Sequence, residues 1–460
     1  MKKNKNIEKK VLSRCYRYFL FFIMISLDGT LDISNGIFSS ASKEIIKRLN
    51  INNLKFGSFS TATSAGKIIS SSLFILLNQR ISRKWLIVLC IILHSIFLFC
   101  FKITENANII IIIFLLLGIT KNIVTIYIPV WINQYGRSEY KTVQITTTQF
   151  FQSMGKITGN LFNYLLGYEN WQNNLVISGI ILLILSFCCI ISNENYFSRT
   201  LFPKSAEENK KIKRISSTFF EENDINNKYD NKNKNINFFS EISILFNNPL
   251  YIICLICGSI IRGLITCLNY WFPDFLRNIA EKQYLKMTIA YTIISLVGPF
   301  GGVIANAILI PIIGSYENRK ASWPIVFLQL ISSIFAISIG LMKSLISVCI
   351  ITIFYFIFNY SAHALIQGIL ISCVDKKLSA TGYAFANACM QIIIGPTPII
   401  YGIINDKFKD IYPWLPMCSI MSINLLAIPL LIYLAMLRNK KFDEEEKMKE
   451  NKNQEELIDK

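Results

Sequence analysis

The chain has 460 residues, of which 52% are hydrophobic and 17% charged, and its formal net charge is +18. Soluble domains are less apolar and carry about 25% charged residues, so this composition excludes an ordinary soluble protein. The basic excess does not indicate nucleic-acid binding, because the lysines lie in tails and loops rather than in one basic domain.

Apolar runs of about 20 residues recur along the whole chain, and each is long enough to cross a bilayer as a helix. A backbone exposed to lipid must satisfy its own hydrogen bonds, so each run is predicted to be helical. The predicted spans are 16–38, 56–77, 85–103, 108–131, 144–166, 173–192, 250–271, 286–312, 321–342, 345–370, 380–404 and 414–437. The sequence therefore predicts an all-α membrane protein with twelve transmembrane helices in two six-helix halves.

The connection between spans six and seven differs in composition from the rest of the chain. It is rich in Asn, Lys and Glu and has too little apolar surface to fold. We predict an N-terminal half over 1–192, a disordered cytosolic linker over 193–245, a C-terminal half over 246–438 and a charged cytosolic tail over 439–460. Seven basic residues lie before the first span or at its start, which favours a cytosolic N-terminus, although the short loops alone do not decide the orientation. An even number of spans then places both termini in the cytosol; the sequence does not indicate which membrane holds the protein.

Two lysines occur in matching surroundings in the middle of predicted spans. Lys67 lies in SAGKIIS (64–70) of span two, and Lys156 lies in SMGKITG (153–159) of span five. A cation at mid-bilayer costs about 2.5–3.5 kcal/mol on insertion scales, so it normally faces a bundle interior or a watery cavity. The recurrence of this frame three helices later indicates the nested repeats of a secondary transporter. A chance repetition in a chain rich in Ile and Ser is the alternative.

Other intramembrane polar residues are candidates for solute binding or coupling. Asp28 and Asp32 are four residues apart and share one face of span one, where they would carry the coupling proton if transport is coupled. Pro299 and Pro396, in spans eight and eleven, each remove a backbone hydrogen bond and are predicted to break the helix for gating, although packing kinks would look the same. The candidate solute-binding residues are Lys67, Lys121, Lys156, Arg262, Asn269, Asn359, His363 and Gln367.

Several of these residues have an alternative structural interpretation. Asp28 or Asp32 could form an ion pair with Lys67 inside the N-terminal half, and Lys121 could snorkel or donate to a backbone carbonyl. His363 has a reference pKa near 6.5 and could act as a proton switch, or it could be a core histidine with its partners satisfied.

Arg262 is the better candidate for solute binding, because the membrane interior of its half contains no evident acidic partner. A guanidinium presents a planar fork of donors to a phosphate or carboxylate.

The turn after span two, QRISRK (79–84), resembles the D-R-x-G-R-K cytosolic signature of the major facilitator superfamily. The basic residues are retained as Arg80, Arg83 and Lys84, whereas the family's aspartate is replaced by Gln79. The resemblance implies that these three basic residues contribute to gating, but that the ion pair normally made by the aspartate is missing.

Two further segments are similar to the Spinster-type branch of this superfamily, which transports lysophospholipids and sphingolipid phosphates. They are WFPDFL (271–276) and GPTPIIYG (395–402). A W-x-P turn also occurs in organic-phosphate exchangers. Lys121 lies where Spinster-type proteins would be expected to carry an acidic residue, so their coupling chemistry cannot simply be transferred to this chain.

The resemblance implies a secondary active transporter whose two halves expose a central site alternately to each side of the membrane. The four candidate cations outnumber the two aspartates, so we expect an anionic organic solute: a carboxylate, a phosphate ester or a lysolipid. Protons would be the coupling ion, if there is one, and membrane lipids would surround the protein. The alternatives are a cationic or zwitterionic solute bound by the aspartates, and a receptor or scaffold that no longer transports. The sequence contains no catalytic motif, phosphate-binding loop or metal-ligand cluster, so we expect no enzyme activity, no cofactor, no metal and no nucleic-acid partner.

Overall fold

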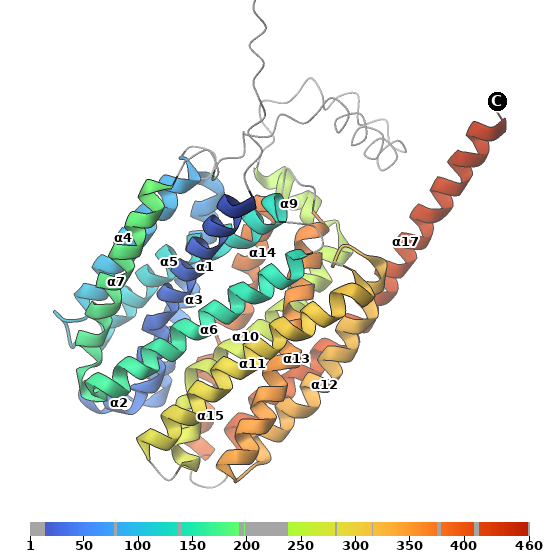
Figure 1. Cartoon of the computed structure of the whole chain (residues 1–460). Helices are drawn as coiled ribbons and strands as arrows, with labels where there is room; N and C mark the ends of the chain where they lie inside the picture. The colour runs from blue at the N-terminus through green and yellow to red at the C-terminus, as the bar shows by residue number, and fades with distance from the viewer. Residues whose placement is uncertain are drawn as a thin grey trace, which may run out of the picture.

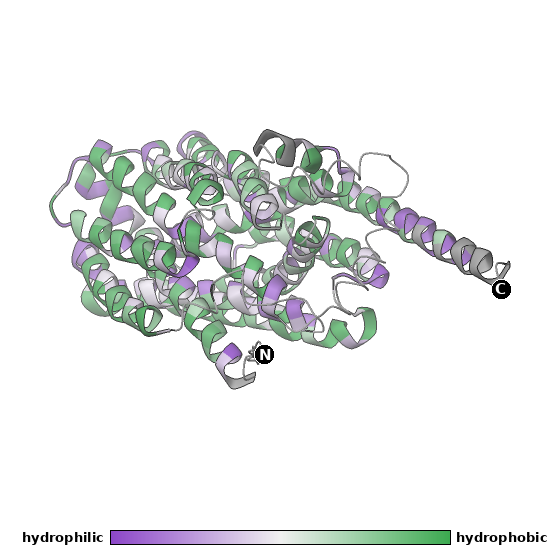
Figure 2. Ribbon diagram, turned by 90° about the horizontal axis from the view of Figure 1, so that it is seen from above, coloured by the Kyte–Doolittle hydropathy of each residue, from purple (hydrophilic) through white to green (hydrophobic). Residues whose placement is uncertain are grey.

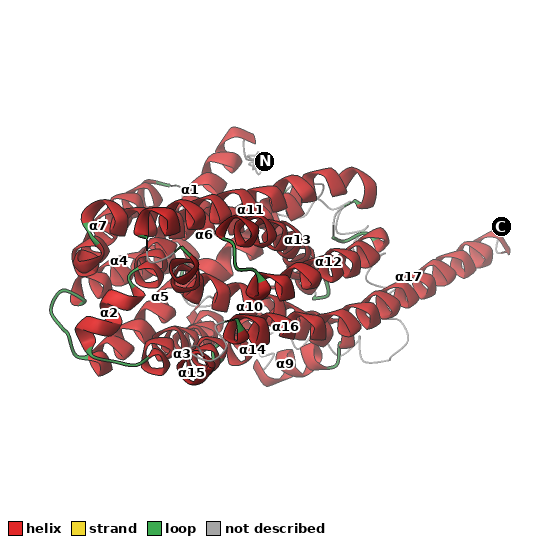
Figure 3. Cartoon of the chain, turned by 90° about the horizontal axis from the view of Figure 1, so that it is seen from below, coloured by secondary structure: helices red, strands yellow, loops and turns green. Residues whose placement is uncertain are grey.

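The computed structural model describes residues 14–77, 81–136, 140–192, 197, 238–280, 283–314, 316–374, 379–408 and 414–458. Within these residues the chain is helical and contains no strand (Figure 3). The helices of the N-terminal half are α1 (Arg14–Ser40), α2 (Ser42–Leu49), α3 (Asn53–Leu77), α4 (Arg83–Cys100), α5 (Ala107–Tyr135), α6 (Lys141–Leu166) and α7 (Trp171–Ile191). Those of the C-terminal half are α9 (Phe238–Phe246), α10 (Pro249–Ile279), α11 (Tyr284–Ile313), α12 (Ser322–Leu341), α13 (Leu345–Ser372), α14 (Ser379–Ile394), α15 (Thr397–Phe408), α16 (Leu415–Ser422) and α17 (Ala427–Ile458). Figure 1 shows them as one bundle of long helices.

A helix occupies the place of every predicted span. Eleven of the spans in the described residues are both long and apolar enough to cross a membrane. The remaining one, the predicted fifth span, is α6; its 26 residues are long enough to cross, but its Thr, Gln and Asn side chains lower its hydropathy. Many of these polar residues are buried, and Gln149 and Gln152 line the cavity described below. The prediction of an all-α membrane protein is therefore confirmed, and the count of twelve agrees with the position and length of α6.

The two predicted helix breaks have different outcomes. Span eleven is interrupted at Gly395 and Pro396, since α14 ends before them and α15 begins after them. Span eight is continuous, because α11 runs through Pro299 without an interruption. The loss of a backbone hydrogen bond at Pro299 therefore does not interrupt the helix, and the gating role of Pro299 stays a prediction. A membrane helix tolerates a proline where neighbouring helices pack against it, and Gly298 lies directly against Phe356 of α13.

Glycines allow the helices of the N-terminal half to pack closely. A Cβ atom on Gly66 would lie 2.0 Å from the Leu115 carbonyl oxygen of α5. A Cβ atom on Gly155 would lie 1.8 Å from the Gly29 carbonyl oxygen of α1. Small residues at such positions let helix backbones approach in a membrane, where van der Waals packing drives association. The α3–α5 and α1–α6 pairs are therefore held by the glycines of the two matching sequence frames.

Most of the predicted linker lies outside the described residues. Its described parts are Phe197 and the segment from Phe238 to Leu245, which belongs to α9. This end of the linker is thus helical rather than disordered, because its FFSEISILF sequence is apolar enough to pack on the bundle. The predicted charged tail is the C-terminal part of α17. This part is largely hydrophilic and projects from the bundle (Figures 1 and 2).

Both ends of the bundle carry contacts between the halves. We call the end where α7 stops and α10 begins the linker face, and the opposite end, where α2 lies, the α2 face (Figure 1). On the α2 face, the charged contacts are Lys43 with Asp274, at 3.4 Å, and Glu44 with Arg277, at 3.4 Å. In addition, Tyr270 of α10 donates a hydrogen bond of 2.6 Å to the Phe56 carbonyl of α3.

On the linker face, the loop between α11 and α12 contacts both the N-terminal half and α17. Glu317 forms an ion pair with Lys141 of α6 at 2.9 Å, and the Tyr316 hydroxyl donates to Asn133 of α5 at 3.3 Å. Arg319 pairs with Asp443 of the projecting helix at 2.5 Å. The loop thus contacts the N-terminal half on one side and the tail helix on the other.

Candidate solute-binding cavity

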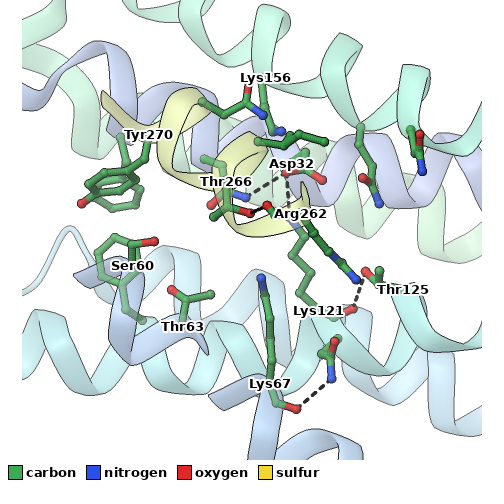
Figure 4. A pocket seen from close by; sticks show the side chains of 18 of the residues that line it. Asp32, Ser60, Thr63, Lys67, Lys121, Thr125, Lys156, Arg262, Thr266 and Tyr270 are labelled. Atoms are coloured by element: carbon green, nitrogen blue, oxygen red, sulfur yellow. Dashed lines mark hydrogen bonds and ion pairs between the residues drawn. The ribbon is translucent and has the colours of Figure 1, made fainter. Parts of the chain in front are cut away.

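A cavity of about 120 Å³ lies in the middle of the bundle, between the contacts at its two faces. Its walls come from α1, α3, α5 and α6 of the N-terminal half and from α10 and α13 of the C-terminal half. Four cationic side chains point into it from four different helices (Figure 4): Lys67, Lys121, Lys156 and Arg262. Its remaining wall combines hydroxyl and amide groups with the aromatic rings of Phe38, Phe114 and Tyr270.

The matching sequence frames explain how two of the lysines reach this cavity. Gly66 and Gly155 turn toward helices of their own half, and the next residue in each frame is Lys67 or Lys156. Successive residues on a helix point about 100° apart, so a glycine packed against a neighbour places the following lysine toward the adjacent space. Both lysines line the same cavity, which supports reading the two frames as structurally equivalent.

Asp32 forms an ion pair with Lys121 rather than with Lys67. The Lys121 Nζ lies 2.8 Å from the Asp32 Oδ1, which also accepts a hydrogen bond of 2.8 Å from Asn35. This pair corrects two structural interpretations of the sequence. Lys67 is not the partner of Asp32, and Lys121 does not snorkel. Lys121 lies on α5, which faces α1 across the cavity, and its side chain reaches the carboxylate directly (Figure 4).

Asp28 is fully buried one turn before Asp32, and it does not line the cavity. Its carboxylate accepts hydrogen bonds from Thr125 at 3.1 Å and from Gln152 at 2.7 Å, and both of these donors line the cavity. Asp28 therefore lies directly behind the wall and is connected to the cavity through two polar side chains.

Three of the four cations have no close carboxylate among the described residues. No ion pair within 4.0 Å involves Lys67, Lys156 or Arg262 in that part of the chain. Lys156 lies beside Asp32 (Figure 4), whose carboxylate is already paired with Lys121. The cavity and its wall thus contain four cations and two carboxylates, an excess of two positive charges.

A chain of hydrogen bonds crosses between the halves next to this cavity. Arg262 donates to the Asn387 Oδ1 at 3.1 Å, and the Asn387 Nδ2 donates to the Asn122 Oδ1 at 2.6 Å. The Asn122 Nδ2 then donates to the Lys67 backbone carbonyl at 2.9 Å. Asn122 and Asn387, which we call the asparagine bridge, are both at most 2% exposed.

His363 and Gln367 of α13 are close to Gln149 of α6. The Gln149 Nε2 lies 2.7 Å from the His363 Nδ1 and 3.4 Å from the Gln367 Oε1. His363 lines the main cavity, and a second hollow of about 40 Å³ is lined by His363, Gln367 and Arg262. Among the described residues, the buried His363 Nε2 and Asn269 Nδ2 have no hydrogen-bond partner, and both residues line the main cavity.

The structure places Asn359 away from both hollows. Its amide accepts from Ser332 of α12 at 3.2 Å and donates to Tyr355 at 3.0 Å. Its predicted role in solute binding is corrected: its helical spacing from His363 is right, but its side chain turns toward α12 and is satisfied there.

The predicted gate residues contact their own half. Lys84 donates to the carbonyls of Ile190 and Ser192 at 2.6 Å each, at the end of α7. Arg83 donates to Gln134 of α5 at 3.5 Å. Arg80 lies outside the described residues.

Sequence reasoning missed several cavity residues, among them Asn122, Thr125, Gln152 and Tyr270. The first two are polar residues inside the apolar fourth span, and this unusual placement was the available signal. Tyr270 is ordinary near the end of a membrane helix, and only its hydrogen bond to the other half distinguishes it.

Comparison with known proteins agrees with this architecture. The sequence model of the Major Facilitator Superfamily matches residues 19–398. No curated protein matches the sequence. The solved structures that are similar include a bacterial homolog of the human lysosomal transporter Spinster in an inward-facing, unoccupied conformation, with a TM-score of 0.65 and 14% identity over 94% of this chain and 98% of the other. The proton:xylose symporter XylE, bound to 6-bromo-6-deoxy-D-glucose, has a TM-score of 0.72 and 10% identity over 92% and 96%. The nucleoside transporter NupG has a TM-score of 0.55 and 12% identity over 92% and 99%.

At these identities the solved structures show the shared fold alone, whereas the family match covers most of the chain. That match agrees with the architecture described above: helical spans in two halves, a polar cavity between the halves and contacts at both faces. The chain is a multi-pass membrane protein that belongs to the major facilitator superfamily, a family of membrane transporters.

Proposed function

We propose that this protein transports a small organic anion by alternating access of its two halves to the central cavity. The observation that carries the proposal is the excess of two positive charges in a cavity lined by both halves. Buried cations without partners are unfavourable in a membrane interior. A bound anion would supply the missing charge, whereas a cationic solute would add to the repulsion.

The size and lining of the cavity favour a small solute over a lysolipid. A cavity of about 120 Å³, lined by charged and polar side chains, fits a small solute. The two excess charges favour an anion with two negative charges, such as a phosphate monoester or a dicarboxylate. Arg262, Lys67 and Lys156 would bind its charged groups, and Asn269 and His363 would donate or accept further hydrogen bonds.

The carboxylates are the candidates for coupling to protons. Asp32 lines the cavity in its ion pair with Lys121, and Asp28 lies behind it. A solute anion beside Lys121 would compete with Asp32 for the ammonium group and so change how readily the carboxylate binds a proton. This gives a direct physical link between solute and proton.

Uptake into proteoliposomes tests the proposal. The purified protein would be given labelled methyl phosphate, succinate, acetate or choline, with and without a pH gradient, and empty liposomes would serve as the control. We expect saturable uptake of methyl phosphate or succinate in preference to acetate. Choline uptake would instead support a cationic solute, and the absence of saturable uptake of any compound would support a receptor or scaffold. Either result would overturn the proposal.

A further inference from the structure

The asparagine bridge connects the two cations that face each other from opposite halves. Lys67 belongs to α3 in the N-terminal half, and Arg262 belongs to α10 in the C-terminal half. Neither has a carboxylate partner among the described residues, and both line the cavity. Asn122 and Asn387 link the Lys67 backbone to the Arg262 guanidinium through three consecutive hydrogen bonds of 2.6 to 3.1 Å.

All four polar atoms of the asparagine bridge have partners. The Asn387 oxygen accepts from Arg262, and its nitrogen donates to the Asn122 oxygen. The Asn122 nitrogen donates to the Lys67 carbonyl and, at 3.0 Å, to Ser71. A buried polar network in which each member is satisfied is rigid and defines one arrangement of its members. Breaking the central bond would leave the buried Asn122 oxygen without a partner and the Asn387 nitrogen with only the Ser71 hydroxyl at 3.4 Å, which is costly.

We infer that Asn122 and Asn387 are positioning residues, which hold Lys67 and Arg262 as one anion-binding pair shared by the two halves. Asn387 accepts a hydrogen bond from one guanidinium nitrogen of Arg262, and the guanidinium also lines the cavity. Asn122 fixes the turn of α3 from which the Lys67 side chain extends. Asn122 and Asn387 belong to different halves. Lys67 and Arg262 therefore reach their observed separation only when the halves are in contact at the asparagine bridge.

The consequence concerns specificity. An anion with two charges can interact with both cations at once, and its affinity depends on the distance between them. An anion with one charge needs only one of the cations and depends less on that distance. The asparagine bridge should therefore favour divalent over monovalent anions. This inference rests on the proposed anion transport.

The test compares Asn387→Ala with Asn306→Ala. Asn306 of α11 is 1% exposed and donates to Thr146 of α6 at 2.7 Å, so it also bridges the halves, but it does not line the cavity. Affinities for methyl phosphate and acetate would be measured by isothermal titration of the purified full chain. We expect Asn387→Ala to weaken methyl phosphate binding about tenfold, as for a lost hydrogen bond to a charged group, and acetate binding less than threefold. Asn306→Ala should leave the ratio of the two affinities unchanged.

A double-mutant cycle identifies the residue through which Asn387 acts. In an Arg262→Gln background, Asn387→Ala should weaken binding less than twofold further, because the guanidinium that it positions is gone. If Asn387→Ala does not fold, Asn122→Ala provides a second variant in the other half. Asn122→Ala should also lower the ratio of the affinity for methyl phosphate to the affinity for acetate. The inference is overturned if Asn387→Ala and Asn306→Ala change the ratio of the two affinities equally. It is also overturned if the effects of Asn387→Ala and Arg262→Gln on the affinity for methyl phosphate are fully additive. Either result would leave the proposed anion transport intact. A wild-type protein that binds neither anion would overturn the proposed function itself.

Discussion

Replacing Lys121 or Lys67 by methionine should have different effects, although both lysines line the same cavity. The Lys121 ammonium lies 2.8 Å from the Asp32 carboxylate, and the two side chains are 10% and 5% exposed. At this distance, with an effective dielectric constant of about 20, the Coulomb attraction is about 6 kcal/mol, most of which compensates for the loss of hydration. Lys121→Met leaves Asp32 buried with only the Asn35 hydrogen bond and the nearby Lys156 charge.

Breaking a buried ion pair by removing one partner costs about 3–5 kcal/mol, and we expect the lower end because Asn35 and Lys156 remain. Lys67 has no carboxylate to leave behind and lies among other cations. Lys67→Met should therefore leave the free energy of unfolding unchanged or increase it. It should lower the affinity for methyl phosphate about tenfold or more, since a charge-assisted hydrogen bond contributes about 1.5–3 kcal/mol.

Unfolding by SDS in mixed micelles measures the stability of each variant, and isothermal titration measures its affinity for methyl phosphate. The double variant Lys121→Met with Asp32→Asn should recover at least half of the stability lost in Lys121→Met, because residue 32 then carries no charge that has lost its partner. The assignment of Lys121 as the structural partner of Asp32 is refuted if Lys121→Met and Lys67→Met lower the free energy of unfolding equally. It is also refuted if the effects of Asp32→Asn and Lys121→Met on that free energy are additive.

Three further substitutions test the packing and the contacts at the two faces. Gly155→Ala places a methyl group 1.8 Å from a backbone oxygen of α1, so it should lower the free energy of unfolding by about 1–3 kcal/mol in the same SDS unfolding assay. Gly263→Ala is the control: the nearest atom to its methyl group would be 3.6 Å away, and its effect should be much smaller. Glu44→Gln removes an ion pair between the halves on the α2 face and should broaden the distance distribution between spin labels on α2 and α11; an unchanged distribution would show that the pair does not hold this face closed. Asp443→Asn removes an ion pair between the tail helix and the α11–α12 loop and should speed hydrogen exchange in that loop, whereas Glu444→Gln, which affects only a pair within α17, should not.

The sequence could predict the spans and much of the cavity because the membrane imposes strong rules on both. A backbone in lipid must be helical, so apolar length alone locates the spans. A charge in the middle of a span must face the interior, so Lys67, Lys121, Lys156 and Arg262 could be placed in a cavity before any helix was positioned. These four predictions agree with the lining of the cavity.

Partners could not be predicted in the same way, because they depend on distances between helices. The sequence suggested Lys67 as a partner for Asp28 or Asp32, and only the placement of α5 against α1 selects Lys121 for Asp32. Asn387 lies 265 residues from Asn122, and no local pattern relates them. The side chain of Asn359 shows the same limit: helical spacing gives the face, but the neighbouring helix decides which contact it makes.

The charges of the cavity suggest how solute binding and closure could be connected under the proposed function. Lys67 and Arg262 are like charges contributed by different halves, so bringing the halves together around an unoccupied cavity works against their repulsion. An anion bound between them replaces that repulsion by two attractions, and its binding energy then favours the conformation in which the asparagine bridge is formed. A ligand shifts a conformational equilibrium only by the difference in its affinity for the two states. A site divided between the halves provides such a difference, since it is complete only when they meet, whereas Lys121 and Asp32 lie within one half and remain paired as the halves move.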